Sequence, residues 1–189
     1  MIHKSIEIEY SDKKLSKVEF EQKINAFETQ FGCTLPIVFK DFLHQYGNAS
    51  LEVVVPVLEP NPLCDEVAMD LLFGFEADEN IIKNTEIADG LPVAIPFAED
   101  LSGNWYYLYL GHHQKESKVY FHDRQGRYHW TDQQFYAMFE NLAPEIQTYL
   151  ELRKNNQLPA KDEAFQDFYL VGNTFEEFIS NLKPFTYED

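Results

Sequence analysis

Cysteine is scarce in this chain, whose 189 residues include only Cys33 and Cys64. Two cysteines are too few for a disulfide framework, and neither lies in a metal-binding spacing. No basic cluster or paired cysteine surrounds either one, so neither is predicted to be a reactive thiolate. We therefore expect neither a disulfide-stabilised secreted fold nor cysteine chemistry.

Glycine-rich loops and long apolar runs are also missing. The eight glycines are scattered singly, so no phosphate-binding loop is indicated, and no Gly-x-Ser-x-Gly nucleophile elbow occurs. No window approaches the length of a membrane-spanning helix, and the N-terminal residues carry charges where a signal peptide needs an apolar run. These absences predict a cytoplasmic protein with no cofactor and no membrane association.

Positive charge is the third deficit. Fifteen Lys and Arg face 32 Asp and Glu, which leaves a net charge of −17. Binding to phosphates requires Lys and Arg to displace counterions, so we expect no nucleic-acid partner. An acidic chain attracts basic proteins and speeds their approach. The same composition also suits simple solubility, so charge alone does not decide between these interpretations.

Apolar residues, by contrast, are plentiful: 44% of the chain is hydrophobic and 15% is aromatic. This supplies a core for one domain over residues 1–189. Ser16 and Glu19 form a capping box for a helix that ends at Gly32, and a second helix begins near Pro36. Strands are predicted at 2–10, 51–58, 91–97, 105–110, 118–122 and 128–130, and helices at 131–155 and after Thr174. This order predicts an α+β fold with antiparallel hairpins.

The histidines are the best candidates for a metal site. They lie close to one another in the sequence, and imidazoles and carboxylates suit divalent metals. No known ligand spacing is matched, so we predict polar hairpin residues and no metal. A small-ligand or enzymatic site at these residues, or in a cleft near Asp100 and Asn104, stays as an alternative. The cluster consists of His112, His113, His122, Asp123 and His129.

One segment is unusually acidic. From Glu59 to Asp100 there are eleven acidic residues and one lysine, a local balance of −10. The segment is predicted to be mostly loop and strand ends, where binding residues tend to lie. Acids that steer a basic partner toward aromatic anchors are one interpretation, and a solvated face over core aromatics is the other. The predicted partner-binding residues are Glu76, Asp78, Glu79, Glu99, Asp100, Asn104, Trp105 and Tyr106.

Several segments, in this order along the chain, resemble the motifs of the SMI1/KNR4 (SUKH) family. They are the first two helices with Phe31-Gly32 and Leu35-Pro36, then Leu72-Phe73-Gly74, then Ile95-Pro96-Phe97-Ala98-Glu99-Asp100 with Ser102-Gly103-Asn104, then Val119-Tyr120 with Asp123, and finally Thr174, Phe175, Phe178, Ile179 and Leu182. Two features depart from the family pattern. Leu101 stands where a glycine is common, and residues 131–157 look like a helical insertion.

The resemblance implies an α+β domain with a mixed, largely antiparallel sheet flanked by helices. Bacterial members are inferred to be immunity proteins that neutralise cognate toxins, often nucleases, by binding them. Fungal members are regulatory scaffolds, which is the alternative function here. No catalytic residue is known for the family, so the resemblance implies a non-enzymatic protein whose partner is a basic toxin. A monomer and a homodimer are both compatible with the sequence.

Overall fold

The fold is that of a computed structural model, which describes residues 2, 6–10, 14–76, 80–88, 91, 93–111, 113–114 and 116–186. Its helices and strands, in chain order, are β1 (Ile8–Glu9), α1 (Lys17–Phe31), α2 (Ile37–Tyr46), β2 (Ser50–Pro56), β3 (Glu66–Leu72), α3 (Ile81–Ile87), β4 (Ala94–Glu99), β5 (Trp105–Tyr109), β6 (Lys118–His122), α4 (Asp132–Met138), α5 (Pro144–Lys154), β7 (Phe168–Gly172), α6 (Phe175–Asn181) and β8 (Lys183–Pro184).

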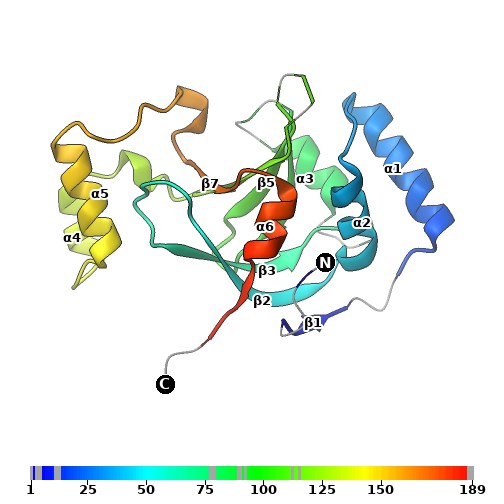
Figure 1. The fold of residues 1–189 in the computed structure, drawn as a ribbon, viewed down its shortest axis with the longest axis horizontal. Coiled ribbons are helices and arrows are strands. Elements are labelled where there is room, and N and C mark those ends of the chain that lie inside the picture. Colours follow the sequence, from blue (N-terminus) through cyan, green and yellow to red (C-terminus); the bar gives the residue numbers. More distant parts are fainter. Residues whose placement is uncertain are drawn as a thin grey trace.

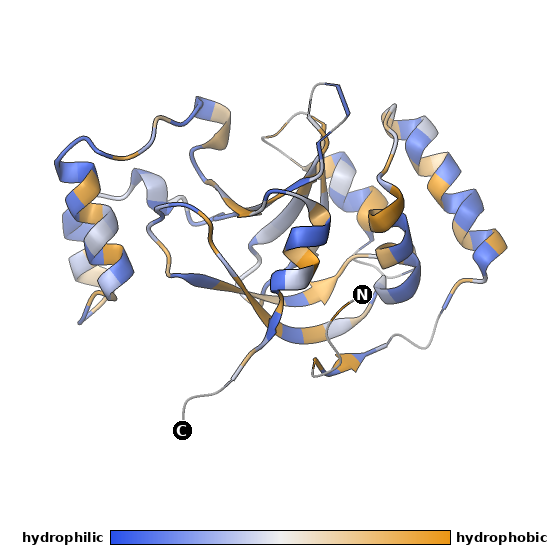
Figure 2. Ribbon diagram, viewed as in Figure 1, coloured by the Kyte–Doolittle hydropathy of each residue, from blue (hydrophilic) through white to orange (hydrophobic). Residues whose placement is uncertain are grey.

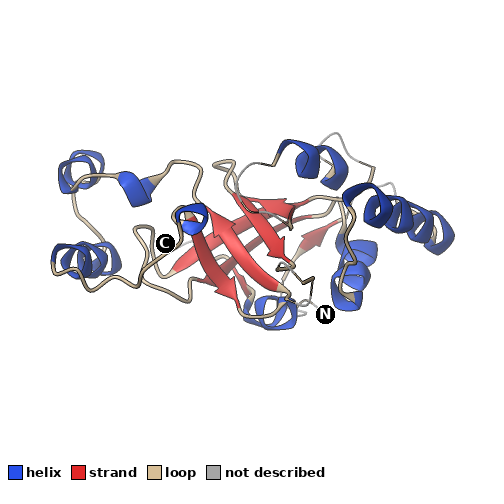
Figure 3. Cartoon of the chain, turned by 90° about the horizontal axis from the view of Figure 1, so that it is seen from above, coloured by secondary structure: helices blue, strands red, loops and turns tan. Residues whose placement is uncertain are grey.

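A twisted sheet forms the centre of the molecule (Figure 1). Its strand order is β1-β2-β3-β4-β5-β6-β7, with β8 also paired to β2, and every pairing of these strands is antiparallel. Figures 1 and 3 place α4 and α5 at one end of the sheet and α1, α2 and α3 at the other. The predicted α+β class with a largely antiparallel sheet is therefore confirmed.

Both ends of the chain pair with the same edge of β2. β1 lies beside the first residues of β2, and β8 lies beside Val53 and Val54. Just beyond β8, the Phe185 N–H donates to the Glu52 carbonyl at 3.0 Å. Unpaired backbone groups on an edge strand invite pairing with another chain. The two terminal strands therefore protect β2 over residues 50–54.

The far edge of the sheet is covered by the chain that follows β2. The Leu58 N–H donates to the Leu170 carbonyl of β7 at 2.8 Å, and the Leu170 N–H donates to the Glu59 carboxylate at 2.8 Å. Glu59 also forms an ion pair with Lys161 at 3.0 Å. These contacts satisfy backbone groups of β7 at this edge of the sheet.

Aromatic rings join the helices to the sheet. Phe97 of β4 is fully buried. It packs edge-on against Phe39 and Phe42 of α2 and against Phe175 and Phe178 of α6, with ring centroids 5.5 to 6.4 Å apart. Edge-to-face packing is a favoured arrangement of aromatic rings. In Figure 2, apolar residues are concentrated in the strands and in stripes along the helices.

Gly74 lies directly against the Asn48 side chain. A Cβ on Gly74 would come within 2.5 Å of Asn48 Oδ1, which is closer than van der Waals contact allows. Asn48 has a positive φ of 65°, and its N–H donates to the Leu72 carbonyl at 3.1 Å. The glycine of Leu72-Phe73-Gly74 is thus required by close packing between the end of α2 and the end of β3.

Some local predictions differ from the structure. The strand predicted at 128–130 is wrong, because Arg127–His129 is a 3₁₀ helix. Gly126 turns the chain there with φ 64°, and the Asp123 carboxylate accepts from the Arg127 N–H at 2.9 Å. β7 and α3 were not predicted. Alternation of polar and apolar residues is the usual sign of a strand. β7 lacks this alternation because it is buried on both faces.

The helical stretch at 131–157 consists of two helices separated by a break. Thr131 and Gln134 form the capping box that starts α4, and Pro144 occupies the first turn of α5, where its missing N–H is tolerated. The two helices pack around a small apolar cluster of their own, made of Phe135, Leu142, Ile146, Tyr149 and Leu150. That residues 131–157 are an insertion within a single domain, 1–189, stays a prediction.

Gly74→Ala is expected to lower the free energy of unfolding by about 1–3 kcal/mol, because the added methyl group overpacks the contact with Asn48. Urea denaturation measures the change. Asn48→Gly removes the obstructing side chain and tolerates the positive φ. The double variant should therefore lose less stability than the sum of the two single losses. If the losses of stability in the two single variants simply add, the close approach of Gly74 to Asn48 is not the cause of the loss in Gly74→Ala.

Candidate functional site

The acidic segment 59–100 does not form a single surface. Glu59 is bound by Lys161 at 3.0 Å, and Glu66 forms an ion pair with Lys183. These two sites lie on different elements, and a cation from a distant part of the chain compensates each of them. The local balance of −10 therefore overstates the free negative charge.

The structure separates the predicted partner-binding acids into two groups. Glu76 is half-buried and forms an ion pair with Lys23 of α1 at 2.9 Å. Asp78 and Glu79 lie outside the described residues. Glu99 and Asp100 line an open groove together with four other acids.

This acidic groove has a volume of about 800 Å³. Its acids come from β1 and the residue before it, from β2, from β3 and from the end of β4. None of the described residues that line it is Lys, Arg or His. Apolar residues of the same strands and of the C-terminal segment complete the walls. The six carboxylates are those of Glu7, Glu9, Glu52, Asp70, Glu99 and Asp100.

Strand alternation explains why these acids share one face. In β2, Leu51 and Val53 are buried, whereas Glu52 between them is exposed. In β3, Met69 is fully buried and the next residue, Asp70, is half-buried. Successive side chains of a strand point to opposite faces. Glu52 and Asp70 therefore project from the face turned away from the apolar core.

The Asp100 carboxylate holds the turn between β4 and β5. It accepts from the Ser102 N–H at 2.9 Å and from the Asn104 N–H and side-chain amide at 2.8 Å each. Gly103 has a positive φ of 78°, which glycine adopts without strain. Asn104 is buried, and its Oδ1 accepts from the Arg124 N–H at 3.1 Å. Much of the hydrogen-bonding capacity of Asp100 and Asn104 is therefore used inside the protein.

Leu101 stands at the tip of this turn and is 92% exposed. Its N–H donates to the Asp70 carboxylate at 3.1 Å, which ties the tip of the turn to β3. The backbone that carries this apolar side chain is thus hydrogen-bonded at the rim of the acidic groove.

The aromatic residues predicted to anchor a partner lie in the core. Tyr106 is fully buried, and its hydroxyl donates to the Ala68 carbonyl at 2.6 Å. Trp105 is 8% exposed, and its indole N–H donates to the Glu99 carboxylate at 3.3 Å. The structure corrects the prediction for Tyr106 and for the buried Asn104, because neither offers a surface to a partner. Trp105 instead helps to position Glu99.

A family model for the SMI1 / KNR4 family (SUKH-1) matches residues 21–141, well over half of the 189 residues. The chain belongs to this family. No curated protein and no solved structure matches it significantly. The matched range includes the groove acids of β2, β3 and β4, whereas Glu7 and Glu9 precede it.

The residues that carry the family resemblance serve the fold of this SMI1/KNR4 domain. Glu28 of α1 accepts from the Leu35 N–H at 2.6 Å and forms an ion pair with Lys40 at 2.7 Å, which fixes the corner between α1 and α2. Asp100 and Asn104 build the β4–β5 turn in the same way. Asp100 thus belongs to a family motif and also lines the acidic groove, where its carboxylate holds the turn.

Four carboxylates of the acidic groove were not predicted as site residues: that of Asp70, and the three of Glu7, Glu9 and Glu52. Alternation with buried residues marks them in the sequence as outward-facing, but this pattern does not show which strands are neighbours. The pairing of β1 with β2 brings the three together, and β3 places Asp70 beside them.

The described histidines do not converge on a metal site. His122 stacks on Phe168 with ring centroids 4.2 Å apart, and burial lowers the pKa of His122. His129 Nε2 lies 3.4 Å from Asp167 Oδ2, and His112 is outside the described residues. Within the described ranges, no three or more His, Cys, Asp or Glu side chains are placed to hold a metal ion.

Two further features bear on other function classes. Burial raises the pKa of the Cys33 thiol, and desolvation of the sulfur raises that of Cys64 although the residue as a whole is exposed, so the thiolate is disfavoured at both. Across the described part of the chain, no helix has both the length and the apolar character needed to cross a membrane.

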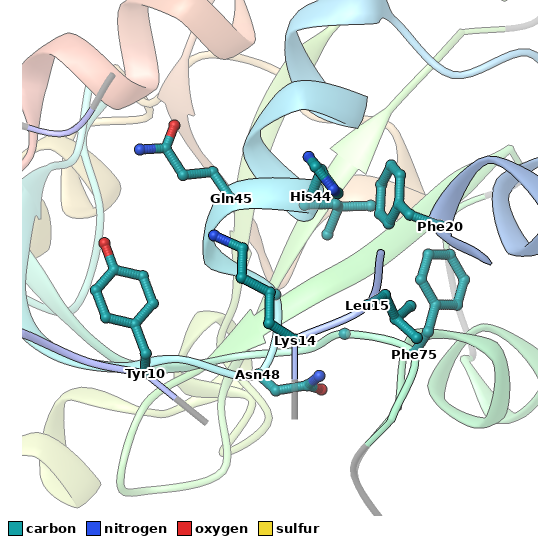
Figure 4. Close-up of a pocket in the computed structure, with 11 residues that line it drawn as sticks. Tyr10, Lys14, Leu15, Phe20, His44, Gln45, Asn48 and Phe75 are labelled. Carbon is teal, nitrogen blue, oxygen red and sulfur yellow. The ribbon is translucent and has the colours of Figure 1, made fainter. Parts of the chain in front are cut away.

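A smaller pocket of about 170 Å³ lies between the chain before α1 and the end of α2. In Figure 4, Phe20 and Phe75 lie on one side of this pocket and Tyr10 on the other, with Lys14 between them. The described residues that line it include no acid. The pocket therefore differs in charge from the acidic groove and does not extend it.

The pKa of the Asp70 carboxyl is raised from its usual value. Burial is the largest cause, and the negative charges of Asp100 and Glu52 raise the pKa further, while the hydrogen bond from the Leu101 N–H opposes them. A cation in the acidic groove would favour the ionised form of Asp70 and lower this pKa.

Asp70→Asn is expected to stabilise the protein at neutral pH. The native state holds the Asp70 proton more tightly than the unfolded state, so the wild type loses stability as pH rises through and above the usual aspartate range. The asparagine does not titrate, and its oxygen can still accept from the Leu101 N–H. Urea denaturation at a series of pH values gives the free energy of unfolding of the wild type and of Asp70→Asn. The two values should be equal near about pH 3 and should differ increasingly toward pH 7. A difference independent of pH would contradict this explanation.

Proposed function

We propose that this SMI1/KNR4 chain is a non-catalytic immunity-type protein that binds a basic toxin through the acidic groove and thereby neutralises it. The observation that carries the proposal is the groove itself, where six carboxylates face one space and no described lining residue is a cation. Membership of a family whose bacterial members are inferred to be immunity proteins supports the same class of function.

The charge distribution favours a basic protein over other partners. A net charge of −17 repels nucleic acid and anionic membranes. A concave surface of one sign also concentrates the field and speeds association with a partner of opposite sign. Glu7, Glu9 and Glu52 are exposed and are the acids best placed to meet such a partner first.

Occlusion is the mechanism that follows from this surface. A nuclease toxin holds the phosphates of its substrate in a basic cleft. An acidic groove docked on that cleft would exclude the substrate without making or breaking a covalent bond. Neutralisation would then be stoichiometric, reversible and sensitive to salt.

Affinity capture tests the proposal. Tagged protein is mixed with lysate of its native cells at about 50 and 200 mM salt, and the captured proteins are identified by mass spectrometry. We expect one basic protein whose toxic activity falls as the captured protein is titrated with the wild type. Glu9→Lys/Glu52→Lys should lose most of the capture and the inhibition, because it replaces attraction with repulsion at the groove.

Glu151→Lys/Glu176→Lys is the matched control. Both residues are exposed and lie outside the acidic groove, and the change in net charge is the same. If both double variants lose capture and inhibition equally, the partner is attracted by the net charge of the whole protein. This result would contradict the groove as the binding site. Capture of an endogenous enzyme or signalling protein through the groove, without toxin inhibition, would contradict immunity and favour the scaffold function.

A further inference from the structure

The acidic groove leaves no free backbone for a partner to pair with along β2. Residues 50–54 face β3 on one side, and on the other side they face β1, β8 and the Phe185 N–H. A partner therefore cannot join the sheet here as an added strand, which is one common way of binding a peptide. Recognition at this groove has to proceed through side chains.

Two exposed apolar side chains border the groove. Leu101, on the β4–β5 turn, is 92% exposed, and Phe185, after β8, is 41% exposed. The elements that carry them are separated by β2 and β3, so the gap between these elements is three strand spacings, roughly 14 Å. Glu52 and Asp70 project from the strands between them. An extended segment of another protein fits in a gap of this width.

Both apolar side chains are attached to ordered backbone. The Leu101 N–H is bound by the Asp70 carboxylate, and the Phe185 N–H is bound by the Glu52 carbonyl. Little conformational freedom of the backbone is then lost on binding, and this favours affinity. Residues that dominate binding energy usually lie in a desolvated centre surrounded by contacts that exclude water.

We infer that the acidic groove receives a segment with one large apolar side chain flanked by lysine or arginine, and that Leu101 and Phe185 contact the apolar side chain. This inference rests on the proposed function and specifies its partner. The carboxylates attract the cationic residues and set the association rate, whereas the apolar contact sets the dissociation rate and selects among basic partners.

Two fluorescent synthetic peptides test the inference. They carry the same number of lysines and differ only at the central residue, which is phenylalanine in one and glycine in the other. Fluorescence anisotropy with the full-length wild type should show about tenfold tighter binding of the phenylalanine peptide, the factor expected for burying one apolar side chain. Leu101→Ala/Phe185→Ala should remove most of this preference and leave the affinity for the glycine peptide unchanged.

Val18→Ala/Ile37→Ala is the matched control, because both residues are exposed apolar side chains outside the groove, and it should keep the preference. Equal affinities for the two peptides, or a preference that survives Leu101→Ala/Phe185→Ala, would overturn the inference. If Glu9→Lys/Glu52→Lys still weakens both peptides in that case, the charged groove of the proposed function stands. If it weakens neither peptide, the proposed function fails as well.

Discussion

The buried ring of Phe97 is the contact on which the rest of the structure depends. It meets rings from α2 and α6 on the core side of the sheet, and the Phe97 carbonyl accepts from the Phe73 N–H at 2.8 Å. One residue thus joins two helices to β4 and aligns β4 with the end of β3. Glu99 and Asp100 follow shortly after Phe97, so packing in the core decides where the acidic groove begins.

Over β2 and β3 the two faces of the sheet have opposite chemistry, whereas β5 and β7 are buried on both faces. Backbone pairing holds neighbouring strands about 4.8 Å apart, and this brings the carboxylates of β1, β2 and β3 close together on the outer face. Burial, and to a smaller extent the neighbouring Asp100 and Glu52, raise the pKa of Asp70, because each disfavours its charge. In the proposed function, a cationic partner relieves the repulsion that the isolated protein tolerates.

The acidic groove is assembled from nearly the whole length of the chain. Its walls include Glu7 near the N-terminus and Phe185 near the C-terminus, because β1 and β8 share one edge of β2. The family motifs, by contrast, lie in the core and in the β4–β5 turn. Residues that maintain the fold and residues that would select a partner are therefore largely different, which lets one fold meet different partners.

The sequence by itself determined the local structure wherever neighbours along the chain satisfy one another. The Ser16–Glu19 capping box and the helix end at the left-handed Gly32 depend on contacts within a few residues, so their patterns predicted them. Only the tertiary structure decided which acids share a surface. Strand alternation shows that Glu52 points outward but not which strand lies beside it, and ion pairs such as Lys23 with Glu76 join segments far apart in the chain. Burial likewise placed Tyr106 in the core, because an aromatic residue in a strand has the same sequence signature whether it packs inward or meets a partner.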